Sequence, residues 1–566
     1  MKKLTFCFII FGGFQTAFSQ WSNNTAINTA VCTEVGFQHD VRVIPDGKGG
    51  AIAAWLDNRT DATSDTTDAD IFVQRLDKDG YIKYFLDGVG ICINNFDQPS
   101  VNIVTDGASG AIIIWRTTQN GNNDIYVQKI DSVGNIKWAA GGVPVCNDTN
   151  NQKGAKAVSD GAGGAIVSYE YKINGSGNWD IYAQRLDANG NRLWAPTSSG
   201  KNLSVLNDDE NDPRIETDGS GGAIVVWTRY SKTPVDYDII AQKVNSSGTG
   251  VWPTGGVYVC NDAALQVQPK IEPDGSGGAI IVWMDSVGTT VADIYAQRIS
   301  SSNGAKLWNG GNKVAVCTDI TYQGAHDVAS EGINGAVIAW KDYRGGNKDV
   351  YAQKLDLANG ASQWLPVNGI PIVNGLSNEG NPNLWGDGAG NVLCVWQDTM
   401  GFGGDVYAQK IDANGNLLWA VGGAPLATAA KNQTLPKHVP DGAGGLICFF
   451  QDNRDSATTN YDIYAQRLLS DGTLPDGVFN QEMLVESKCY PNPFTEHTTI
   501  QVSGNNKYQV SGIKIYDVFG REVNPSASRT LNGFVIQRGG LLQGNYFYRI
   551  FSDNKPITSG CFIIIN

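Results

Sequence analysis

The chain repeats one pattern of polar and apolar positions along most of its length. A tight Asp-Gly turn leads directly into consecutive apolar residues that end on an aromatic residue, as in "DGSGGAIIVW" at residues 274–283. The acidic residue that opens this pattern stands at 46, 106, 160, 218, 274, 331, 387 and 441, at intervals of 54 to 60 residues. A fixed period of this length indicates a repeat architecture.

Each repeat unit is predicted to hold four short β-strands. Asp-Gly supplies the positive φ of a tight turn after the first strand. The second strand is apolar on consecutive positions, which is typical of a strand covered on both faces. The third carries a phrase such as "DIYAQRLD", and the fourth runs from a Trp to a Cys. Because no segment shows sustained helical periodicity, each unit is predicted to be one blade of a β-propeller.

The two ends of the repeat region complement each other. The eighth unit stops after Gly472 without its Trp and closing strand, whereas residues 21–34 carry Trp21 and Cys32 in the order of that missing piece. We expect this segment to complete the last blade, which removes an exposed sheet edge. The prediction is an all-β chain whose residues 20–480 form an eight-bladed β-propeller, with an N-terminal strand closing the last blade.

Trp and Gln recur at fixed places in the units. Because thirteen of the fifteen Trp fall in two slots, we expect them to pack blades together and not to hold a sugar. The first slot holds Trp55, Trp115, Trp227, Trp283, Trp340 and Trp396, and the second holds Trp21, Trp138, Trp194, Trp252, Trp308, Trp364 and Trp419. A Gln in every third strand must satisfy its hydrogen bonds inside a covered sheet, so we expect it to tie strands or blades together. These residues are Gln74, Gln128, Gln184, Gln242, Gln297, Gln353, Gln409 and Gln466.

Composition narrows the class of partner. The 566 residues carry a formal net charge of −14, which argues against nucleic-acid binding because that affinity depends on Lys and Arg at phosphates. Most cysteines recur at equivalent places, about one unit apart, too far for disulfides. We interpret seven of them as small buried apolar residues: Cys32, Cys92, Cys146, Cys260, Cys317, Cys394 and Cys448. Only Cys489 and Cys561 stand where they could pair.

The N-terminus, "MKKLTFCFIIFGGFQTAFSQW", has the pattern of a secretory signal peptide over residues 1–19. Two Lys precede an apolar run, and small residues end at Ser19, so cleavage would leave Gln20 first. That run is too short to span a bilayer, and no later stretch is long and apolar enough to be a transmembrane helix.

Two resemblances cover the blade scaffold. "LDANGNRLW" resembles the tryptophan-docking repeat of quinoprotein dehydrogenases, which are also eight-bladed, but no adjacent Cys pair is present to lie against a quinone. The turns also resemble sialidase Asp boxes, with Asp-Gly and Gly-Trp intervals that are each one residue longer, and the Arg cluster of those enzymes cannot be assigned. We interpret both as shared hairpin physics, in which Asp and Gly make the turn and Trp packs beneath it.

The last segment is different. "CYPNPFTEHTTIQV", "IKIYDVFGREV" and "LLQGNYFYRI" resemble the type A C-terminal sorting domain of the type IX secretion system, over residues 487–566. The residues that carry the resemblance are Tyr490, Pro491, Asn492, Pro493 and Phe494 of its opening, together with Gly520, Gly544 and Tyr546. The resemblance implies a small β-sandwich that directs passage across the outer membrane, with the type IX machinery as partner and a secreted or outer-membrane surface-attached location. Short alternating strands with Gly and Asn turns agree with that fold.

Residues with catalytic or metal-binding chemistry are few. Three His, at 39, 326 and 438, precede the acidic turns of different units, share no metal-ligand spacing, and are expected at a surface or strand edge. Asp61, Asp65, Asp68 and Asp70 offer oxygen ligands of the kind calcium takes, yet fit no EF-hand loop and read as a solvated hairpin tip. Three Asp–Arg pairs, expected to pair locally at a blade rim, are Asp57 with Arg59, Asp342 with Arg344, and Asp452 with Arg454. No cofactor or catalytic residue is assigned.

Two classes of function remain open. The first is a non-enzymatic binding or scaffold module, outside the cell, for a glycan or a surface protein. The alternative is a secreted polysaccharide-acting enzyme, a glycosidase or lyase, that uses the propeller channel. Near-identical blades would favour binding, whereas one asymmetric cluster of Asp, Glu, Arg and His at a channel mouth would favour an enzyme. The largest departures from the repeat are at residues 57–70 and 195–213.

Overall fold

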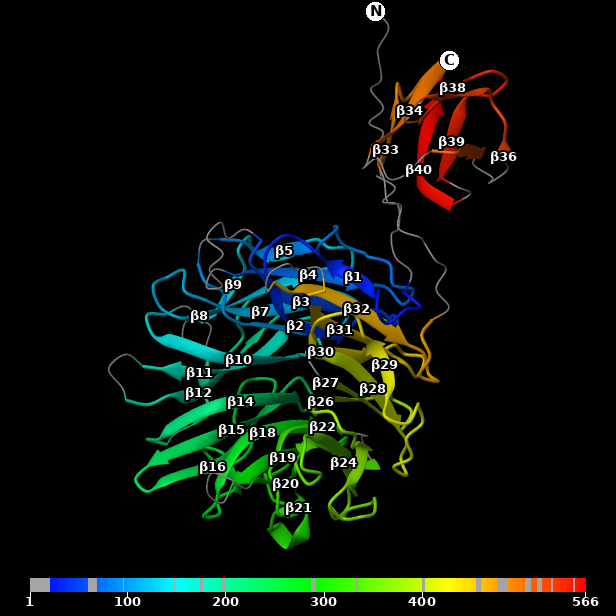
Figure 1. Ribbon diagram of the computed structural model, residues 1–566. Helices are drawn as coiled ribbons and strands as arrows, with labels where there is room; N and C mark the ends of the chain where they lie inside the picture. The colour runs from blue at the N-terminus through cyan, green and yellow to red at the C-terminus, as the bar shows by residue number, and fades with distance from the viewer. Residues whose placement is uncertain are drawn as a thin grey trace, which may run out of the picture. The chain divides into compact units, whose positions relative to one another are not determined.

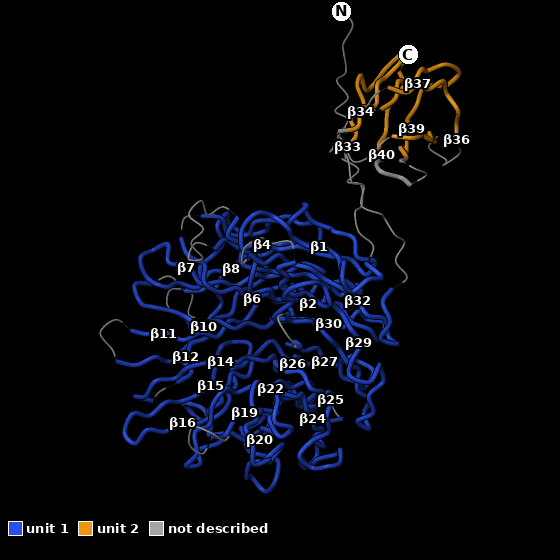
Figure 2. Tube along the Cα trace, in the orientation of Figure 1, with its two compact units in different colours: residues 1–477 blue, residues 478–566 orange. Residues whose placement is uncertain are grey.

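The computed structural model describes residues 21–565 except for 60–68, 95, 147, 174–176, 195–198, 205, 287–291, 331–333, 400–402, 455–459, 476–485, 504–509, 517–521, 531–532 and 553–554. The predicted signal peptide, residues 1–19, and Gln20 lie outside these residues. The chain divides into two compact units, residues 1–477 and 478–566, each of which is described by itself (Figure 2). The described elements are almost all strands, so the predicted all-β class is confirmed.

The first unit is built of blade-like, four-stranded antiparallel sheets (Figure 1). In spatial order within each sheet, the strands are β2 (Gln38–Pro45), β3 (Ala51–Asp57), β4 (Asp70–Leu76) and β5 (Val89–Cys92); β6 (Val101–Thr105), β7 (Ala111–Thr117), β8 (Asp124–Ile130) and β9 (Val143–Cys146); β10 (Asn151–Ser159), β11 (Ala165–Lys172), β12 (Asp180–Leu186) and β13 (Lys201–Asn202); β14 (Asp209–Thr217), β15 (Ala223–Lys232), β16 (Val235–Val244) and β17 (Val257–Cys260); β18 (Leu265–Pro273), β19 (Ala279–Ser286), β20 (Ala292–Ile299) and β21 (Val314–Cys317), with a 3-10 turn η1 (Asn309–Gly311) before β21; β22 (Gln323–Ser330), β23 (Ala336–Asp342), β24 (Asp349–Leu355) and β25 (Ile370–Val373); β26 (Glu379–Gly386), β27 (Val392–Asp398), β28 (Asp405–Ile411) and β29 (Ala424–Ala427); and β30 (Gln433–Pro440), β31 (Leu446–Asp452), β32 (Asp462–Leu468) and β1 (Thr29–Cys32).

These sheets form a closed ring. The first strand of each sheet contacts the first strand of the next along the chain, and β30 contacts β2, so the last sheet meets the first. The first strands therefore surround the centre of the ring (Figure 1). The second strands are buried almost without interruption, as in β3 and β31, because neighbouring sheets cover both of their faces.

The N-terminal segment closes the ring as predicted. Strand β1 pairs antiparallel with β32, with Thr29 opposite Ala465 and Ala30 opposite Tyr464. The Gln466 amide donates to the Ser22 carbonyl over 2.6 Å. Sheet eight is thus made from both ends of the first unit.

The Trp of the second slot joins each sheet to the next. Trp138 is buried, and its indole N–H donates across the interface to the Ala188 carbonyl over 3.0 Å. The same bond runs from Trp194, Trp252, Trp308, Trp364 and Trp419 to carbonyls of the following unit, and from Trp21 to Lys78 across the seam. In the first unit Tyr84 replaces Trp, and its hydroxyl donates to the Asp131 backbone carbonyl over 2.9 Å. The interpretation of these Trp as packing devices is confirmed.

Two further repeated side chains hold each unit in register. Gln128 on β8 donates to the Ala139 carbonyl over 2.7 Å and accepts from the Trp138 N–H over 3.0 Å, which ties the third strand to the segment that leads to the fourth. The residue after the repeated Gln is Lys or Arg in every unit. In the first unit this residue is Arg75, which donates to the turn residue Asp46 over 2.8 Å and also to the Ser132 carbonyl of the following unit. The expected tying role of the Gln is confirmed.

The seven repeated cysteines are buried free thiols, as predicted. Burial raises the pKa of Cys146 to about 12, so this thiol stays protonated and behaves as a small apolar side chain. Cys489 and Cys561 are free as well.

The second unit holds two four-stranded sheets around one core. The first sheet is β33 (Glu486–Tyr490), β34 (His497–Ser503), β38 (Gly533–Gln537) and β37 (Ala527–Thr530), and the second is β36 (Glu522–Val523), β35 (Gly512–Tyr516), β39 (Gly544–Ser552) and β40 (Lys555–Ile564). Ile500 and Ile536 of the first sheet share a buried cluster with Tyr548 and Phe562 of the second.

Removal of the seam contact tests the closure. We expect Trp21→Ala to lower the free energy of unfolding of the first unit by about 3–5 kcal/mol, because it leaves a cavity and an unpaired carbonyl between sheets. Trp138→Ala, at an equivalent interface inside the chain, should lower it by a similar amount in a denaturant titration. Trp179→Ala, at a half-buried Trp outside both slots, should lower it much less. If Trp21→Ala behaved like Trp179→Ala, the N-terminal segment would not seal the ring.

Candidate functional site in the central cavity

A cavity of about 1180 Å³ lies at the centre of the ring. All eight first strands border it through the residue four positions before the acidic turn residue, which we call the lining position. Along the chain this position holds Arg42, Asn102, Lys156, Arg214, Lys270, Asp327, Asn383 and Lys437. Strand alternation sends the same face of every first strand inward. The Trp, Gln and turn Asp repeat almost unchanged, but the lining position differs from unit to unit.

Basic side chains dominate this position. Three of the five have acidic partners: Arg42 with Asp40 at 2.7 Å, Arg214 with Asp212 at 2.6 Å, and Lys270 with Asp327 at 3.4 Å. Within the described part of the chain, neither Lys156 nor Lys437 forms an ion pair or a side-chain hydrogen bond. Both are only partly exposed. Burial, together with the charges of Arg214 and Arg42, lowers the pKa of Lys156 to about 8. Burial and then Arg42 likewise lower the pKa of Lys437.

Two carboxyls border one side of the cavity. Glu216 on β14 and Glu272 on β18 stand two residues before the acidic turns of adjacent units. Burial raises the pKa of Glu216 to about 7. Burial and then the charge of Glu216 raise the pKa of Glu272 well above its ordinary value. Glu272 also accepts from the Ser330 N–H over 3.3 Å. Around neutral pH this pair therefore holds at least one proton.

A polar chain continues around the wall through three units. Asp327 pairs with Lys270 and accepts from the Asn383 amide over 3.0 Å and the Leu384 N–H over 2.9 Å. Burial opposes ionisation of Asp327, but Lys270 and these donors outweigh it and lower its pKa. His438 Nδ1 lies 3.2 Å from the Asn383 Oδ1 atom. The chain fixes the orientation of Asn383 at the cavity.

The expected surface or strand-edge placement is wrong for two of the three His. His326 and His438 lie in first strands, as the sequence indicates, but are 4% and 1% exposed. Burial is the main cause that lowers the pKa of His326 to about 4 and of His438 to about 3, so both are neutral at physiological pH. Their burial was not evident from the sequence because the first strands are short and rich in polar residues. His39 is half-buried and stacks on Phe37 with ring centroids 4.6 Å apart.

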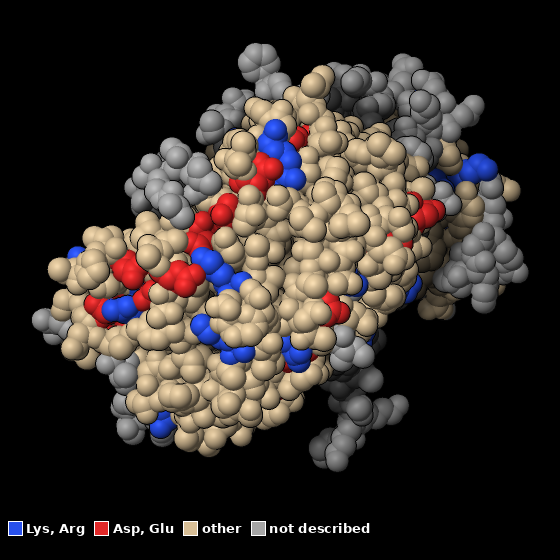
Figure 3. All heavy atoms as spheres, turned by 90° about the horizontal axis from the view of Figure 1, so that it is seen from below, with Lys and Arg blue, Asp and Glu red and all other residues tan. Residues whose placement is uncertain are grey.

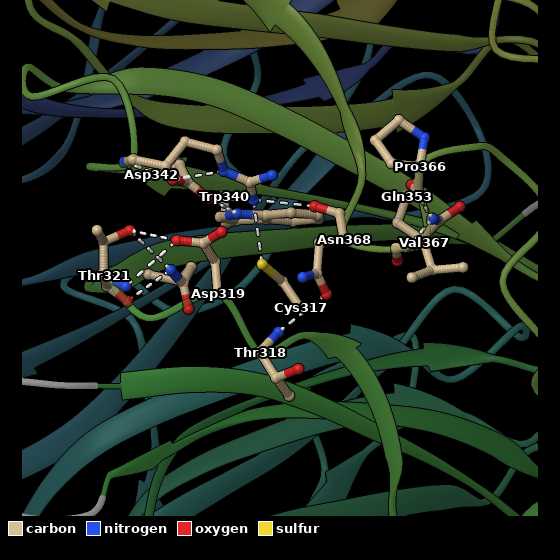
Figure 4. A network of polar contacts seen from close by, with 12 residues as sticks. Cys317, Thr318, Asp319, Thr321, Trp340, Asp342, Gln353, Pro366, Val367 and Asn368 are labelled. Atoms are coloured by element: carbon tan, nitrogen blue, oxygen red, sulfur yellow. Dashed lines mark hydrogen bonds and ion pairs between the residues drawn. The ribbon is translucent and has the colours of Figure 1, made fainter.

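The three predicted Asp–Arg pairs form local ion pairs, as expected. Arg59 lies 2.6 Å from Asp57, Arg344 lies 2.6 Å from Asp342, and Arg454 contacts Asp452. In the sixth unit Asp342 also accepts from the Trp340 indole over 2.8 Å, while Arg344 donates to the Cys317 sulfur and to the Asn368 carbonyl (Figure 4). These bonds join the β23–β24 hairpin to Cys317 of β21 and to Asn368, two residues before β25, so the network has a structural role.

One cluster has the composition of a metal site. The ligand atoms of Cys260, Asp262 and Asp285 lie within 4.8 Å of one another. The Lys313 ammonium occupies the space between the carboxylates, 2.8 Å from Asp262 and in contact with Asp285. Arg59 and Arg344 hold the equivalent place beside Cys32 and Cys317. We interpret the cluster as an internal ion pair.

Of the four Asp in the candidate calcium segment, Asp61, Asp65 and Asp68 lie outside the described residues. Asp70 begins β4 and is 1% exposed, so this residue is not part of a solvated tip. On the described part of the face in Figure 3, acidic and basic side chains stand in small groups of mixed sign. The cavity, with five cations at one position, differs from this outer face.

The sorting-motif residues have structural partners in the second unit. Asn492 accepts from the Ile563 N–H over 2.8 Å and donates to the Cys561 carbonyl, which joins it to β40. Phe494 and Tyr546 are buried against Phe562, whereas Tyr490 is 81% exposed. The Pro491 carbonyl accepts from the Thr498 hydroxyl over 2.6 Å. Pro493 connects Asn492 to Phe494, Gly544 begins β39, and Gly520 lies outside the described residues.

Comparison with known families gives one match. Residues 488–565 match the secretion system C-terminal sorting domain. This domain indicates handling by type IX secretion and a secreted or cell-surface location for the protein. None of the described helical segments has the length and apolar character needed to cross a membrane.

Among curated proteins, none matches the chain. Solved structures with similarity include polysaccharide lyase Uly1, at 9% identity over 68% of this chain and 94% of that one, with a TM-score of 0.42. The β-propeller domain of the Trilobed protease from Pyrococcus furiosus has 9% identity, coverage of 64% and 94%, and a TM-score of 0.37. An endo-arabinase from Bacteroides thetaiotaomicron has 15% identity, coverage of 48% and 97%, and a TM-score of 0.26. These similarities assign no function.

The carboxyl pair makes stability depend on pH. Below about pH 4.5 Glu216 is protonated in both folded and unfolded chains; as pH rises from there through about 7, the unfolded chain loses its proton first and folding becomes less favourable. A Glu216→Gln/Glu272→Gln variant has no titrating carboxyl at these two positions, so its stability does not fall in this way. Its melting temperature should match the wild type near pH 4.5 and exceed it by a few degrees near pH 8.

The control for this prediction is Glu34→Gln, at an exposed side chain. It should shift the melting temperature little at either pH. A cavity variant whose advantage over the wild type did not grow between these pH values would show that the two carboxyls do not share a poorly solvated site.

Proposed function

We propose that this protein is an exported eight-bladed β-propeller, carried by a C-terminal sorting β-sandwich of the type IX system, that acts as a non-enzymatic binding module with its ligand in the central cavity. The ring of four-stranded sheets and the N-terminal closing strand support the propeller, with domain limits at residues 1–19, 20–480 and 487–566. The two sheets around one core support the sandwich. The ligand is a glycan or a surface protein.

One observation carries the assignment of the site. Each unit repeats the residues that pack and hydrogen-bond the sheets, yet the lining position carries Arg, Lys, Asn or Asp according to the unit. A channel that only spaced the blades would need no such individual polar side chains. Different residues aimed at one cavity give it directional recognition, as in other binding pockets that place a few polar groups.

A secreted polysaccharide-acting enzyme remains the second candidate, because Glu216 and Glu272 form an asymmetric acidic pair on one side of the cavity. Their raised pKa would suit one carboxyl as a general acid. His438, which lies on β30 in a different part of the ring, does not add a base, since it is buried and faces Asn383. We therefore place binding first.

A glycan array combined with a degradation assay separates the two candidates. We expect the full chain to bind a subset of the glycans on the array and to release no shorter products from these glycans in the degradation assay. Glu216→Gln/Glu272→Gln should leave binding within about threefold of the wild type. If the wild type released oligosaccharides and this variant did not, the protein would be an enzyme instead. If the wild type bound no glycan on the array, a glycan would be ruled out as the ligand.

Export is tested on the sorting unit in a host that has a type IX system. Deletion of residues 487–566 should keep the protein from reaching the medium or the cell surface. Phe494→Ala should do the same by unfolding the unit, at a loss of about 3–5 kcal/mol, because Phe494 fills the core. Tyr490→Ala, at an exposed side chain, should leave the melting temperature unchanged and still reduce export if the machinery reads this motif. Normal secretion of the deletion variant would contradict the sorting role.

A further inference from the structure

The central cavity concentrates positive charge in an acidic protein. The chain has a formal net charge of −14, but five of the eight lining positions are Lys or Arg. Acidic neighbours neutralise Arg42, Arg214 and Lys270. Lys156 and Lys437 have no such partner within the described residues. The wall thus presents two cations that no described carboxylate contacts directly, from units three and eight of the ring. Asp212 and Asp40 act on Lys156, and Asp327 and Asp40 act on Lys437, only at longer range.

Partly buried cations of this kind are unfavourable unless something pairs with them. An unpaired charge that loses hydration costs free energy, and like charges in the same wall raise that cost. Burial first, and then like charges that include Arg42, lower the pKa of both lysines in agreement with this cost. An anionic group in the cavity would supply the missing countercharge and form charge-assisted hydrogen bonds with the ammonium groups.

A second feature of the wall is an unrepeated aromatic residue. Trp385 on β26 borders the cavity two positions before the acidic turn residue, where the other units have aliphatic side chains or Glu. It belongs to neither Trp slot and is only partly buried. Part of its ring packs against the buried cluster that contains Val41 and Val439, and the rest borders the cavity and offers an apolar face to a ligand. Such a face packs against the C–H side of a sugar ring, and the amides of Asn102 and Asn383 in the same wall match sugar hydroxyls.

We propose that the cavity binds an acidic polysaccharide, whose carboxylate or sulfate groups pair with Lys156 and Lys437 and whose sugar rings pack on Trp385. This inference rests on the proposed function, because it names the ligand class of the same cavity. The aromatic face and the amides favour a polysaccharide over an acidic peptide, which would use the cations alone. The net charge of the chain disfavours polyanions elsewhere on the molecule, so binding should report on the cavity.

The test compares four labelled oligomers of equal length with the full chain. They are heparin, which is sulfated; polygalacturonate, which carries carboxylates; neutral dextran; and poly-glutamate. We expect heparin or polygalacturonate to bind at least about tenfold more tightly than dextran and poly-glutamate. This affinity should fall as NaCl rises from roughly 50 to roughly 300 mM. Whichever of the two anionic glycans binds more tightly identifies the charged group.

Matched variants assign the binding to the wall. Lys156→Gln/Lys437→Gln should weaken the anionic glycan at least about tenfold, and Lys156→Arg/Lys437→Arg, which keeps the charges, should retain binding. Trp385→Leu should weaken it as well. The control is Lys83→Gln/Lys232→Gln, which removes two charges from ion-paired lysines outside the cavity and should bind as the wild type does. Melting temperatures of all variants verify that they fold.

Three outcomes would overturn the inference. If dextran bound as tightly as the anionic glycans, and Trp385→Leu abolished this binding, the cavity would still be a glycan site but its ligand would not have to be acidic. Poly-glutamate binding as tight as that of the glycans would make the ligand an acidic peptide. Anionic glycan binding that the Gln variant and its control share equally would place the site elsewhere on the protein.

Discussion

The whole first unit depends on one contact, the indole of the second-slot Trp set against the next sheet. A single four-stranded sheet with two apolar faces is unstable in water because both faces would be exposed. The Trp contact places a neighbouring sheet against each one. The indole fills the gap and its N–H occupies a carbonyl that would otherwise be buried unpaired, as between Trp138 and Ala188. Gly190 lies so close that a Cβ there would come within 3.0 Å of the ring. The blade spacing therefore follows from a Trp in one unit and a Gly in the next.

The repeat and the site make opposite use of the same scaffold. Residues between sheets are constrained by identical neighbours in every unit, so Trp, Gln and the turn Asp recur. Side chains at the centre face the cavity and are free of that constraint, which lets Lys156, Asp327 and Asn383 occupy equivalent places in different units. The units therefore differ in their side chains mainly at the lining position, which packing does not constrain. As a result, a symmetric framework surrounds a cavity with an asymmetric wall.

Much of the scaffold could be predicted from the sequence because local rules govern it. Asp-Gly turns, apolar second strands and the displaced Trp21 and Cys32 were enough to predict the four-stranded units and the pairing of β1 with β32. The site was less accessible. The signal was present, as a polar residue four positions before each acidic turn, but only the ring brings residues from 42 to 437 to one cavity. The burial of His438 depends on residues of the adjacent unit, such as Asn383, and has no local signature.

The seam also has a consequence for biogenesis. Strand β1 and its partner β32 stand at opposite ends of the first unit, so β1 must wait while the intervening sheets are synthesised and ordered. Until then both terminal edges of the growing array offer unpaired N–H and C=O groups to other chains. These terminal strand edges would therefore need protection by a chaperone for longer than the edges of the other sheets. Ring closure is then the step after which the polypeptide no longer invites aggregation.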